Sequence, residues 1–329
     1  MKAYFFVITP ANYLGALQAS RDPRFNFSEK ILVVLSDYHR SLIQFNSIIK
    51  EEEWNVIYYP WKNLDRRNKS KWQLILLNWK RLLTFNKLKN LIGPNDIIFW
   101  GNLNHSFFKK IENRCHDIYL IDDGFSTINI LPKLEERFVN STKKKGSTIH
   151  LYTLFQLNST FLIIFNHQFN QIKSLKKHIA KEKSVFFIGQ PLVFNNIVSE
   201  HYYVQTIQTI FTDYEKKGFS CFYLPHRSTT RDYIPSNWKT LEFDYPVEYC
   251  VELGGFQPEI FSTFYSTGVY NLEKYLSLDM KQVEFWRIDE KEISMNYKKP
   301  IESIYSYLTI NNYELKNCNT LLSYSSDDK

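Results

Sequence analysis

Short runs of hydrophobic residues alternate with longer amphipathic segments through the first half of this 329-residue chain. The short runs are typical of buried strands, and the amphipathic segments carry apolar residues at helical spacing. Strands that alternate with helices predict βαβ units and a doubly wound parallel sheet. We therefore predict strands at 3–8, 31–35, 56–59, 97–100 and 118–121, and helices at 12–20, 38–52 and 107–113.

The same alternation resumes after a basic stretch at 173–183. We predict further strands at 184–189, 219–224 and 240–243, a helix at 200–217, and a strand, turn and helix in series from 260 to 276. A charged polar run between two α/β blocks marks a domain boundary. We place it near Lys181, which gives domains 1–181 and 182–329.

The segment 61–92 departs from this rhythm because it holds nine Lys and Arg residues against the single acid Asp65, with Leu and Phe at helical spacings. One interpretation is a basic amphipathic helix that rests on an anionic membrane surface or meets a charged acceptor. The other, which we favour, is a crossover helix that packs its apolar face on the sheet and leaves its charges in water.

Composition narrows the class of protein. Hydrophobic residues at 44% and aromatic residues at 17% indicate a globular chain, and the formal charge of +7 suits an anionic partner such as a nucleotide, a nucleic acid or a membrane surface. Four cysteines without paired spacing fit a reduced, cytoplasmic setting and form no zinc pattern. The apolar segment 151–165 is too short and too polar to span a bilayer.

Candidate chemistry begins at Asp122-Asp123-Gly124, which directly follows the apolar run 118–121. A buried parallel strand that ends in two carboxylates delivers acids to the carboxyl edge of a sheet, where α/β proteins bind ligands. Gly124 allows the sharp exit that such a turn needs. The alternative is an ordinary strand-to-helix turn with Asp as a helix cap.

The second half offers four more candidates. A turn at Gly189-Gln190 could let the backbone approach a ligand, and a histidine at His226 could carry a proton or contact phosphate, with Arg227 as an anion contact. The hydroxyls of Ser262, Ser266 and Thr267 precede a helix, where they could cradle a phosphate or simply cap the helix. Glu248 could accept the hydroxyls of a ribose, or be an exposed charge.

The order of these features resembles that of the bacterial sialyltransferases that build the termini of lipooligosaccharide and capsule. Those families carry an acidic-acidic-Gly motif, then His-Pro, then Ser-Ser or Ser-Thr, and the matches are Asp122-Asp123-Gly124, His226 and Ser266-Thr267. The segments 187–191 and 261–272 are also similar. The resemblance covers most of the second block and the acidic turn, and Arg227 stands where the family has Pro.

This resemblance implies an α/β fold of the GT-B type, in which two Rossmann-like domains face each other across a cleft. It implies an inverting transfer of sialic acid from CMP-sialic acid to a terminal sugar, galactose above all, without a metal or other cofactor. Asp123 would be the general base, with Asp122 as its alternate or orienting neighbour. His226, Ser266 and Thr267 would stabilise the leaving CMP phosphate, and Glu248 would hold the ribose.

Three other functions compete with this one. The donor could be a related CMP-activated nonulosonic acid. Asp122 and Asp123 could hold a divalent cation in a transferase that uses UDP- or GDP-sugars. Outside the enzymes, the basic, tryptophan-containing 61–92 segment could bind nucleic acid, although no nucleic-acid fold motif is present and we expect no such partner. Peripheral contact with the inner face of the cell membrane is a further expectation for this cytoplasmic protein.

Overall fold

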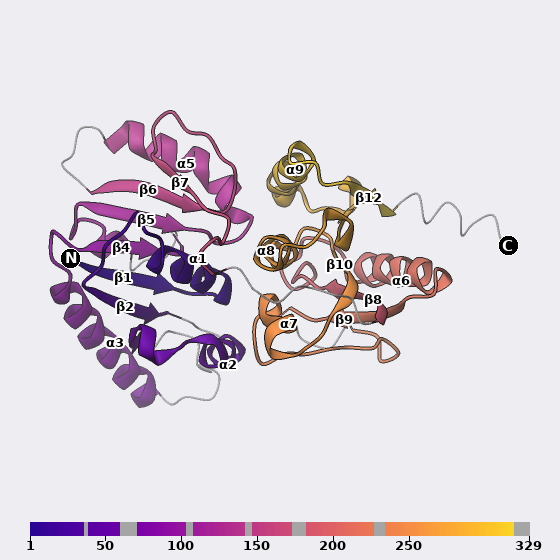
Figure 1. Ribbon diagram of the computed structural model, residues 1–329, viewed down its shortest axis with the longest axis horizontal. Helices are drawn as coiled ribbons and strands as arrows, with labels where there is room; N and C mark the ends of the chain where they lie inside the picture. Colours follow the sequence, from indigo (N-terminus) through magenta and orange to yellow (C-terminus); the bar gives the residue numbers. More distant parts are fainter. Residues whose placement is uncertain are drawn as a thin grey trace. The chain divides into compact units, whose positions relative to one another are not determined.

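The chain forms two compact α/β units, Met1–Ile172 and Lys173–Lys329, in a computed structural model (Figure 1). The structure describes residues 1–35, 39–59, 71–102, 108–141, 147–172, 182–226 and 234–318. The predicted boundary near Lys181 lies outside these described residues.

The first unit is built on a seven-stranded sheet with the order β3-β2-β1-β4-β5-β6-β7, and all of its strand pairs are parallel. The chain order reverses between β1 and β4, which makes this the topological switch point of a doubly wound sheet. The strands are β1 (Lys2–Val7), β2 (Glu29–Val34), β3 (Asn55–Tyr58), β4 (Ile97–Trp100), β5 (Asp117–Ile121), β6 (Thr148–Thr153) and β7 (Ile164–Asn166).

Helices cover both faces of this sheet because its strands are buried on both sides. Along β1, Tyr4 and Phe6 join the core on one face, while Phe5 stacks on Phe99 and meets Trp54 on the other. The first face is covered by α3 (Lys71–Leu91), α4 (Phe108–Ile111) and α5 (Ser126–Ser141), and the second by α1 (Pro10–Ser20) and α2 (His39–Ile48), which is followed by the short 3₁₀ turn η1 (Glu51–Glu53).

The second unit is a five-stranded parallel sheet with the order β12-β11-β10-β8-β9, so its switch point lies between β8 and β10. Its strands are β8 (Glu182–Ile188), β9 (Ser220–Leu224), β10 (Pro258–Thr263), β11 (Val283–Arg287) and β12 (Leu315–Asn317). Its helices are α6 (Glu200–Lys216), α7 (Cys250–Leu253), α8 (Thr267–Leu276) and α9 (Met295–Ile310), with 3₁₀ turns at η4 (Val247–Tyr249), η5 (Met280–Gln282) and η6 (Glu290–Glu292).

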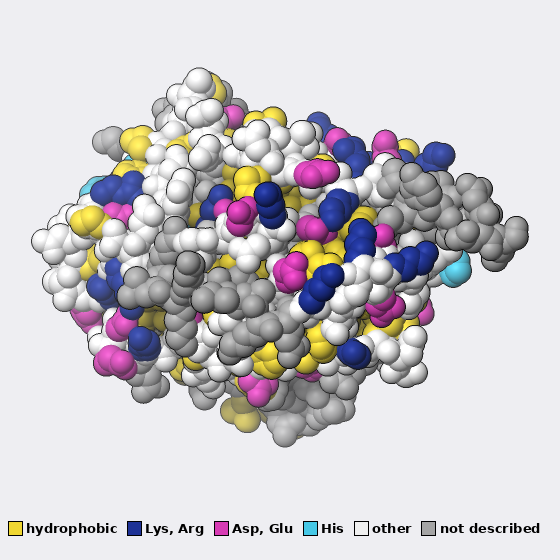
Figure 2. All heavy atoms as spheres, turned by 45° about the vertical axis from the view of Figure 1, so that its right-hand side comes forward, with side chains coloured by type: hydrophobic (Ala, Val, Ile, Leu, Met, Phe, Trp, Pro, Cys, Tyr) yellow, Lys and Arg dark blue, Asp and Glu magenta, His cyan; other side chains and the backbone are white. Residues whose placement is uncertain are grey.

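Basic side chains on this unit pair with acids over aromatic rings. Lys316 Nζ lies 2.6 Å from Glu284 Oε1 and 5.4 Å from the centre of the Trp286 ring, and Lys274 Nζ lies 2.8 Å from Glu273 Oε2. In Figure 2, Lys and Arg side chains accordingly lie beside Asp and Glu and beside hydrophobic ones. This part of the positive charge is therefore locally compensated.

The α/β class, the parallel sheets and nearly all of the predicted strands are confirmed. One prediction is wrong: residues 240–243 form no strand, and only Thr240 makes an isolated bridge, to Tyr223. The segment lies beside the edge strand β9 and leaves it after Leu241 N donates to Tyr223 O.

Candidate functional site

The switch point of the first unit brings three strand ends together around one buried side chain, Asn12. Helix α1 begins there: the Thr9 hydroxyl accepts from Asn12 N, and Asn12 Oδ1 accepts from Thr9 N at 3.0 Å and from Ile8 N at 3.2 Å. This reciprocal pattern is a capping box, with Pro10 at the first helical position. It fixes the orientation of the Asn12 amide with respect to the end of β1.

The amide nitrogen of Asn12 then links the two neighbouring strands. Asn12 Nδ2 donates to Asp122 O at 2.6 Å after β5 and to Gly101 O at 3.3 Å after β4, and the side chain has no exposed surface. A Cβ at Gly101 would lie 2.6 Å from Asn12 Cγ, so only glycine leaves room for this approach. Asn12 therefore holds the ends of β1, β4 and β5 in one arrangement.

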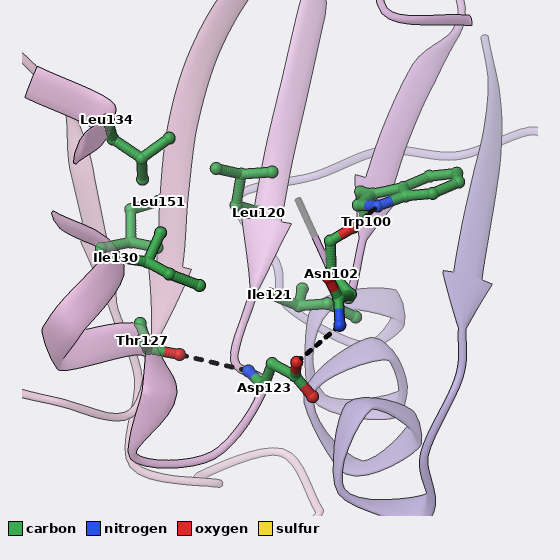
Figure 3. A pocket seen from close by; sticks show the side chains of 10 residues that line it. Trp100, Asn102, Leu120, Ile121, Asp123, Thr127, Ile130, Leu134 and Leu151 are labelled. Carbon is green, nitrogen blue, oxygen red and sulfur yellow. Dashed lines mark hydrogen bonds between the residues drawn. The ribbon is translucent and has the colours of Figure 1, made fainter. Parts of the chain in front are cut away.

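The carboxylate of Asp123 is held by two amides at this point. Asn102 Nδ2 donates to Asp123 Oδ2 at 2.9 Å, and Asn12 Nδ2 lies 3.5 Å from Oδ1. The main chain of Asp123 is fixed as well, because its N–H donates to the Thr127 hydroxyl at 3.1 Å and its C=O accepts from Ser126 Oγ at 2.6 Å (Figure 3). Both hydroxyls belong to the first turn of α5.

Asp123 lines the polar end of a small pocket of about 20 Å³ between the sheet and α5, which is room for about one water molecule. Trp100 and Asn102 lie on one side of it and Ile130 and Leu134 on the other (Figure 3). Gly124 turns the chain out of β5 with a φ of 67°, which is left-handed backbone that favours glycine. The acid is thus presented from a rigid strand end next to a pocket.

Asp122 is turned the other way. Its carboxylate accepts from Thr153 Oγ1 and from Leu154 N, each at 2.6 Å, and its side chain is only 14% exposed. Burial raises the pKa of Asp122 to about 7, outweighing these two hydrogen bonds, which favour the charged form. The two neighbouring carboxylates therefore have separate partners, and Asp123 is the one available to a ligand.

A buried histidine lies behind Asp122. His167 stacks on Tyr152, and its Nε2 lies 4.0 Å from Asp122 Oδ2 without a hydrogen-bond partner among the described residues. Burial lowers the pKa of His167 to about 3, so the ring is neutral. The Tyr152 hydroxyl donates to Asp22 Oδ2 at 2.8 Å. Asp122 is thus enclosed by a neutral, packed environment that disfavours its charge.

The switch point of the second unit is organised by Gln190. Its Oε1 accepts from Tyr265 N at 2.9 Å and lies 3.5 Å from Thr263 Oγ1, and its main chain exchanges hydrogen bonds with the Tyr203 hydroxyl. Gln190 is 7% exposed and joins the loop after β8 to the loop after β10. Its side chain therefore holds these two loops together and does not project from them.

Gly189 has a packing role. A Cβ there would lie 2.3 Å from the Tyr223 hydroxyl oxygen, and the Tyr223 hydroxyl is hydrogen-bonded to that of Tyr203 at 3.0 Å. The room that we expected this glycine to leave for a donor is therefore occupied by the Tyr223 ring.

His226, Ser266 and Thr267 lie at the same carboxyl edge of the parallel sheet, because they follow β9 and β10, the two strands that flank β8. Ser266 is the N-cap of α8 and accepts from Gly268 N at 3.2 Å, and Thr267 is the first helical residue. His226 follows β9 by two residues and is partly exposed. Arg227 lies outside the described residues.

Two predicted donor contacts are buried. Ser262 has no exposed surface, and its hydroxyl accepts from Trp286 Nε1 at 2.9 Å and lies 3.4 Å from the Tyr214 hydroxyl, so it belongs to the core and we remove it from the candidate site. Glu248 is 4% exposed, and its Oε1 accepts from Asn271 Nδ2 on α8 at 3.0 Å. It is fixed against the first turns of α8 and is no exposed charge.

The structure thus adds Asn12 and Asn102 to the residues that the sequence indicated. A signal for Asn12 exists in the segment Thr9-Pro10-Ala11-Asn12, a helix start directly after a strand, but the pattern alone reads as a cap. No sequence signal distinguishes Asn102. Both were found only because three strand ends converge.

No protein-family model and no curated protein matches this chain. Among solved structures, it is similar to a sialyltransferase from Photobacterium damsela, with 11% identity and a TM-score of 0.47 over 96% of this chain and 81% of that one. The GT-B domain of a sialyltransferase from Photobacterium damselae has 12% identity and a TM-score of 0.49 over 96% and 100%. A UDP-glucosyltransferase from Polygonum tinctorium has 10% identity and a TM-score of 0.46 over 96% and 85%.

Proposed function

We propose that this chain is an inverting sialyltransferase of the GT-B type, which moves sialic acid from CMP-sialic acid to a terminal sugar of a surface glycan such as lipooligosaccharide or capsule. The observation that carries the proposal is the fixed Asp123 carboxylate, held by Asn102 at 2.9 Å beside a pocket at the switch point of the first sheet. The family order of Asp122-Asp123-Gly124, His226 and Ser266-Thr267 supports the same reaction.

In this reaction Asp123 is the general base. The acceptor hydroxyl gives its proton to the carboxylate while its oxygen forms the new bond to the anomeric carbon of the donor. The bond from that carbon to the CMP phosphate breaks, and its electron pair leaves with CMP. Because the carbon passes through an oxocarbenium-like state, a weak nucleophile suffices and the fixed position of the base matters most.

Asp122 serves the base without touching the acceptor. Its buried carboxyl group ties the end of β5 to Thr153 and Leu154 after β6, which sets the position of the next residue, Asp123. The pKa of about 7 keeps about half of this group protonated near neutral pH, so it adds less negative charge beside the base than an ordinary Asp would. Two acids in sequence thus have two different tasks.

The second unit binds the donor in this proposal. The N-terminus of α8, with Ser266 as its cap and Thr267 in its first turn, offers N–H groups and a positive dipole end to the CMP phosphate. His226 stabilises the charge that the phosphate gains as the bond breaks. Gln190 keeps the turns after β8 and β10 in place, and the buried Glu248 accepts a hydrogen bond from Asn271 and so holds α8 from below this end.

Transfer from a UDP- or GDP-sugar would depend on a divalent cation bound by Asp122 and Asp123, whereas the proposed transfer from CMP-sialic acid would not. A pair of adjacent acids that bound Mg²⁺ would need both carboxylates on one side, whereas Asp122 and Asp123 have separate partners in this structure. We therefore propose a reaction in which no metal is bound by this pair, with His226 and the α8 N-terminus supplying the positive potential.

The test is an assay of CMP release. The purified protein is incubated with CMP-N-acetylneuraminic acid and a galactose-terminated acceptor, with and without EDTA, and in parallel with UDP- and GDP-sugars and other CMP-nonulosonic acids. We expect acceptor-dependent release of CMP that survives EDTA. Turnover of a UDP- or GDP-sugar that EDTA abolishes would replace the proposal with the metal-dependent one.

A further inference from the structure

Helix α3 carries an exposed stripe of large apolar side chains. Trp72 is 76% exposed, Leu76 69% and Trp79 66%, and the stripe is completed by Ile75, Leu82 and Leu83, each close to half exposed or more. Soluble proteins expose single apolar residues everywhere, but six on one helix form a contiguous patch that marks an interaction surface. The favoured expectation that this helix packs its apolar face on the sheet is therefore correct only in part.

The stripe is continuous along the helix. With about 100° of rotation per residue, positions 72, 75, 76, 79, 82 and 83 fall within an arc of about 120°. The residues that do pack inward lie on the opposite side and near the C-terminal end: Phe85, Leu88 and Ile92 are each 7% exposed or less and belong to the core of the first unit. Helix α3 thus has two apolar faces, and only one is buried.

The C-terminal end of α3 is firmly attached to the first unit. The Tyr4 hydroxyl donates to Leu91 O at 2.8 Å, and Lys110 Nζ lies 5.2 Å above the Phe85 ring. The exposed stripe is therefore presented from a helix whose last turns are fixed to one face of the sheet.

The charge of this helix has one sign. Its basic residues are Lys71, Lys80, Arg81, Lys87 and Lys89, and its sequence holds no Asp or Glu. Lys87 is exposed and lies about 20° beyond one edge of the stripe, and the partly exposed Lys89 lies about 20° beyond the other edge. This contrasts with the second unit, where Lys274 and Lys316 are paired with acids.

We infer that the stripe of α3 is a docking surface for an anionic lipid bilayer. Two tryptophans at the level of the headgroups, aliphatic side chains at the acyl boundary and lysines beside them are the features of a helix that lies in the plane of an interface. No helix in the described ranges is long and apolar enough to cross a membrane, so this contact is peripheral. The inference is independent of the reaction proposed above.

The test is co-sedimentation of the full chain with vesicles. One set contains phosphatidylcholine alone and the other includes about a third phosphatidylglycerol, each at low and at physiological salt. We expect binding to the anionic vesicles that weakens as salt increases, because charged side chains at the surface are screened. Trp fluorescence should shift to shorter wavelength on binding as indole side chains leave water.

A matched pair of variants identifies the surface. The stripe variant Trp72→Ser/Leu76→Ser/Trp79→Ser should bind anionic vesicles on the order of tenfold more weakly. The control Phe161→Ser/Ile163→Ser/Phe194→Ser removes exposed apolar side chains that lie outside α3, and it should bind like the unchanged chain. Circular dichroism and thermal melting check that both variants fold.

Three outcomes would overturn the inference. These are equal binding by the stripe and control variants, equal binding to neutral and anionic vesicles, or a stable dimer in light scattering that the stripe variant alone dissociates. The last result would assign the stripe to contact with a second copy of the chain.

Discussion

Asn102 is the residue whose contribution to the site can be isolated most cleanly. It is partly exposed at the pocket, and its amide donates to Asp123 Oδ2 at 2.9 Å. Asn12 also contacts this carboxylate but holds three strand ends, so its loss would disturb the whole edge of the sheet.

We expect Asn102→Ala to lower kcat about tenfold with little change in KM for the acceptor, because a base that is no longer held loses its orientation for proton transfer. Asn102→Asp should be slower still, since it places a second carboxylate against Asp123. Steady-state kinetics and a thermal melt measure both effects. A normal kcat in Asn102→Ala would show that this contact does not position the base.

The buried carboxyl group of Asp122 should make the stability of the protein depend on pH. Burial raises its pKa from an ordinary 3.8 to about 7 in the folded protein, so the native state holds this proton more tightly than the unfolded chain does. Stability contributed by the protonated group is therefore present below about pH 4 and is lost as pH rises toward and through 7. Replacing the carboxyl with an amide removes this dependence.

As pH rises from 5 to 8, the unchanged chain loses this contribution and the Asp122→Asn variant does not. We accordingly expect the difference in the free energy of unfolding, variant minus unchanged chain, to increase by about 1–3 kcal/mol from pH 5 to pH 8. Burial lowers the pKa of His167, whose contribution has the opposite sign, but it is present in both proteins and cancels in the difference. Urea unfolding of both at the two pH values measures it. Parallel stability profiles would contradict a buried, proton-holding Asp122.

At the scale of elements, the turn after β8 depends on close packing. Gly189→Ala would drive a methyl group against the buried Tyr223 ring, whose hydroxyl oxygen would lie only 2.3 Å from the new Cβ. Overpacking of this kind costs about 1–3 kcal/mol. We expect that loss in urea unfolding and, because the turn joins the candidate donor site, a weaker affinity for CMP.

A double-mutant cycle distinguishes two causes of this loss, a clash with the Tyr223 ring and a requirement of the backbone for glycine. In a Tyr223→Leu background, which removes the ring, Gly189→Ala should cost much less than in the unchanged chain. An equal cost in both backgrounds would mean that the backbone of the turn, and not Tyr223, requires glycine at this position.

The sequence was sufficient for elements that have strong periodic patterns and simple ends. β4 begins and ends where the apolar run 97–100 predicts, and α6 differs from its prediction by a single residue. Other elements escaped prediction. Helix α5 contains Pro132, which interrupts the expected pattern, and β12 is a three-residue edge strand that pairs only with β11.

The candidate site was predictable where one residue type at a strand end carries the chemistry. The position of Asp123 at the end of β5 was predictable in this way, whereas the separate partners of the Asp122 and Asp123 carboxylates depend on burial, which a two-residue motif does not encode. The hydroxyl of Ser262 shows the converse error. It looked like part of a phosphate-binding cluster, but strand alternation turns it into the core under Trp286.

At the scale of the whole molecule, each unit presents its candidate residues at the switch point of its own sheet. The proposed base and its amide partners follow β1, β4 and β5, and the groups proposed for the donor follow β8, β9 and β10. The proposed transfer therefore draws on residues of both units, and the stripe of α3 is a separate surface of the first unit.

The measurement that tests this account most directly compares two Asp→Asn variants on the same strand. Asp123 follows the carboxyl end of β5, while Asp117 begins β5 at the opposite edge of the sheet. Asp117 Oδ1 lies 2.9 Å from His150 Nε2. With CMP-N-acetylneuraminic acid and a galactose-terminated acceptor, Asp123→Asn should release CMP about 10²- to 10⁴-fold more slowly, and Asp117→Asn should keep nearly the full rate. Full activity in Asp123→Asn would contradict the account.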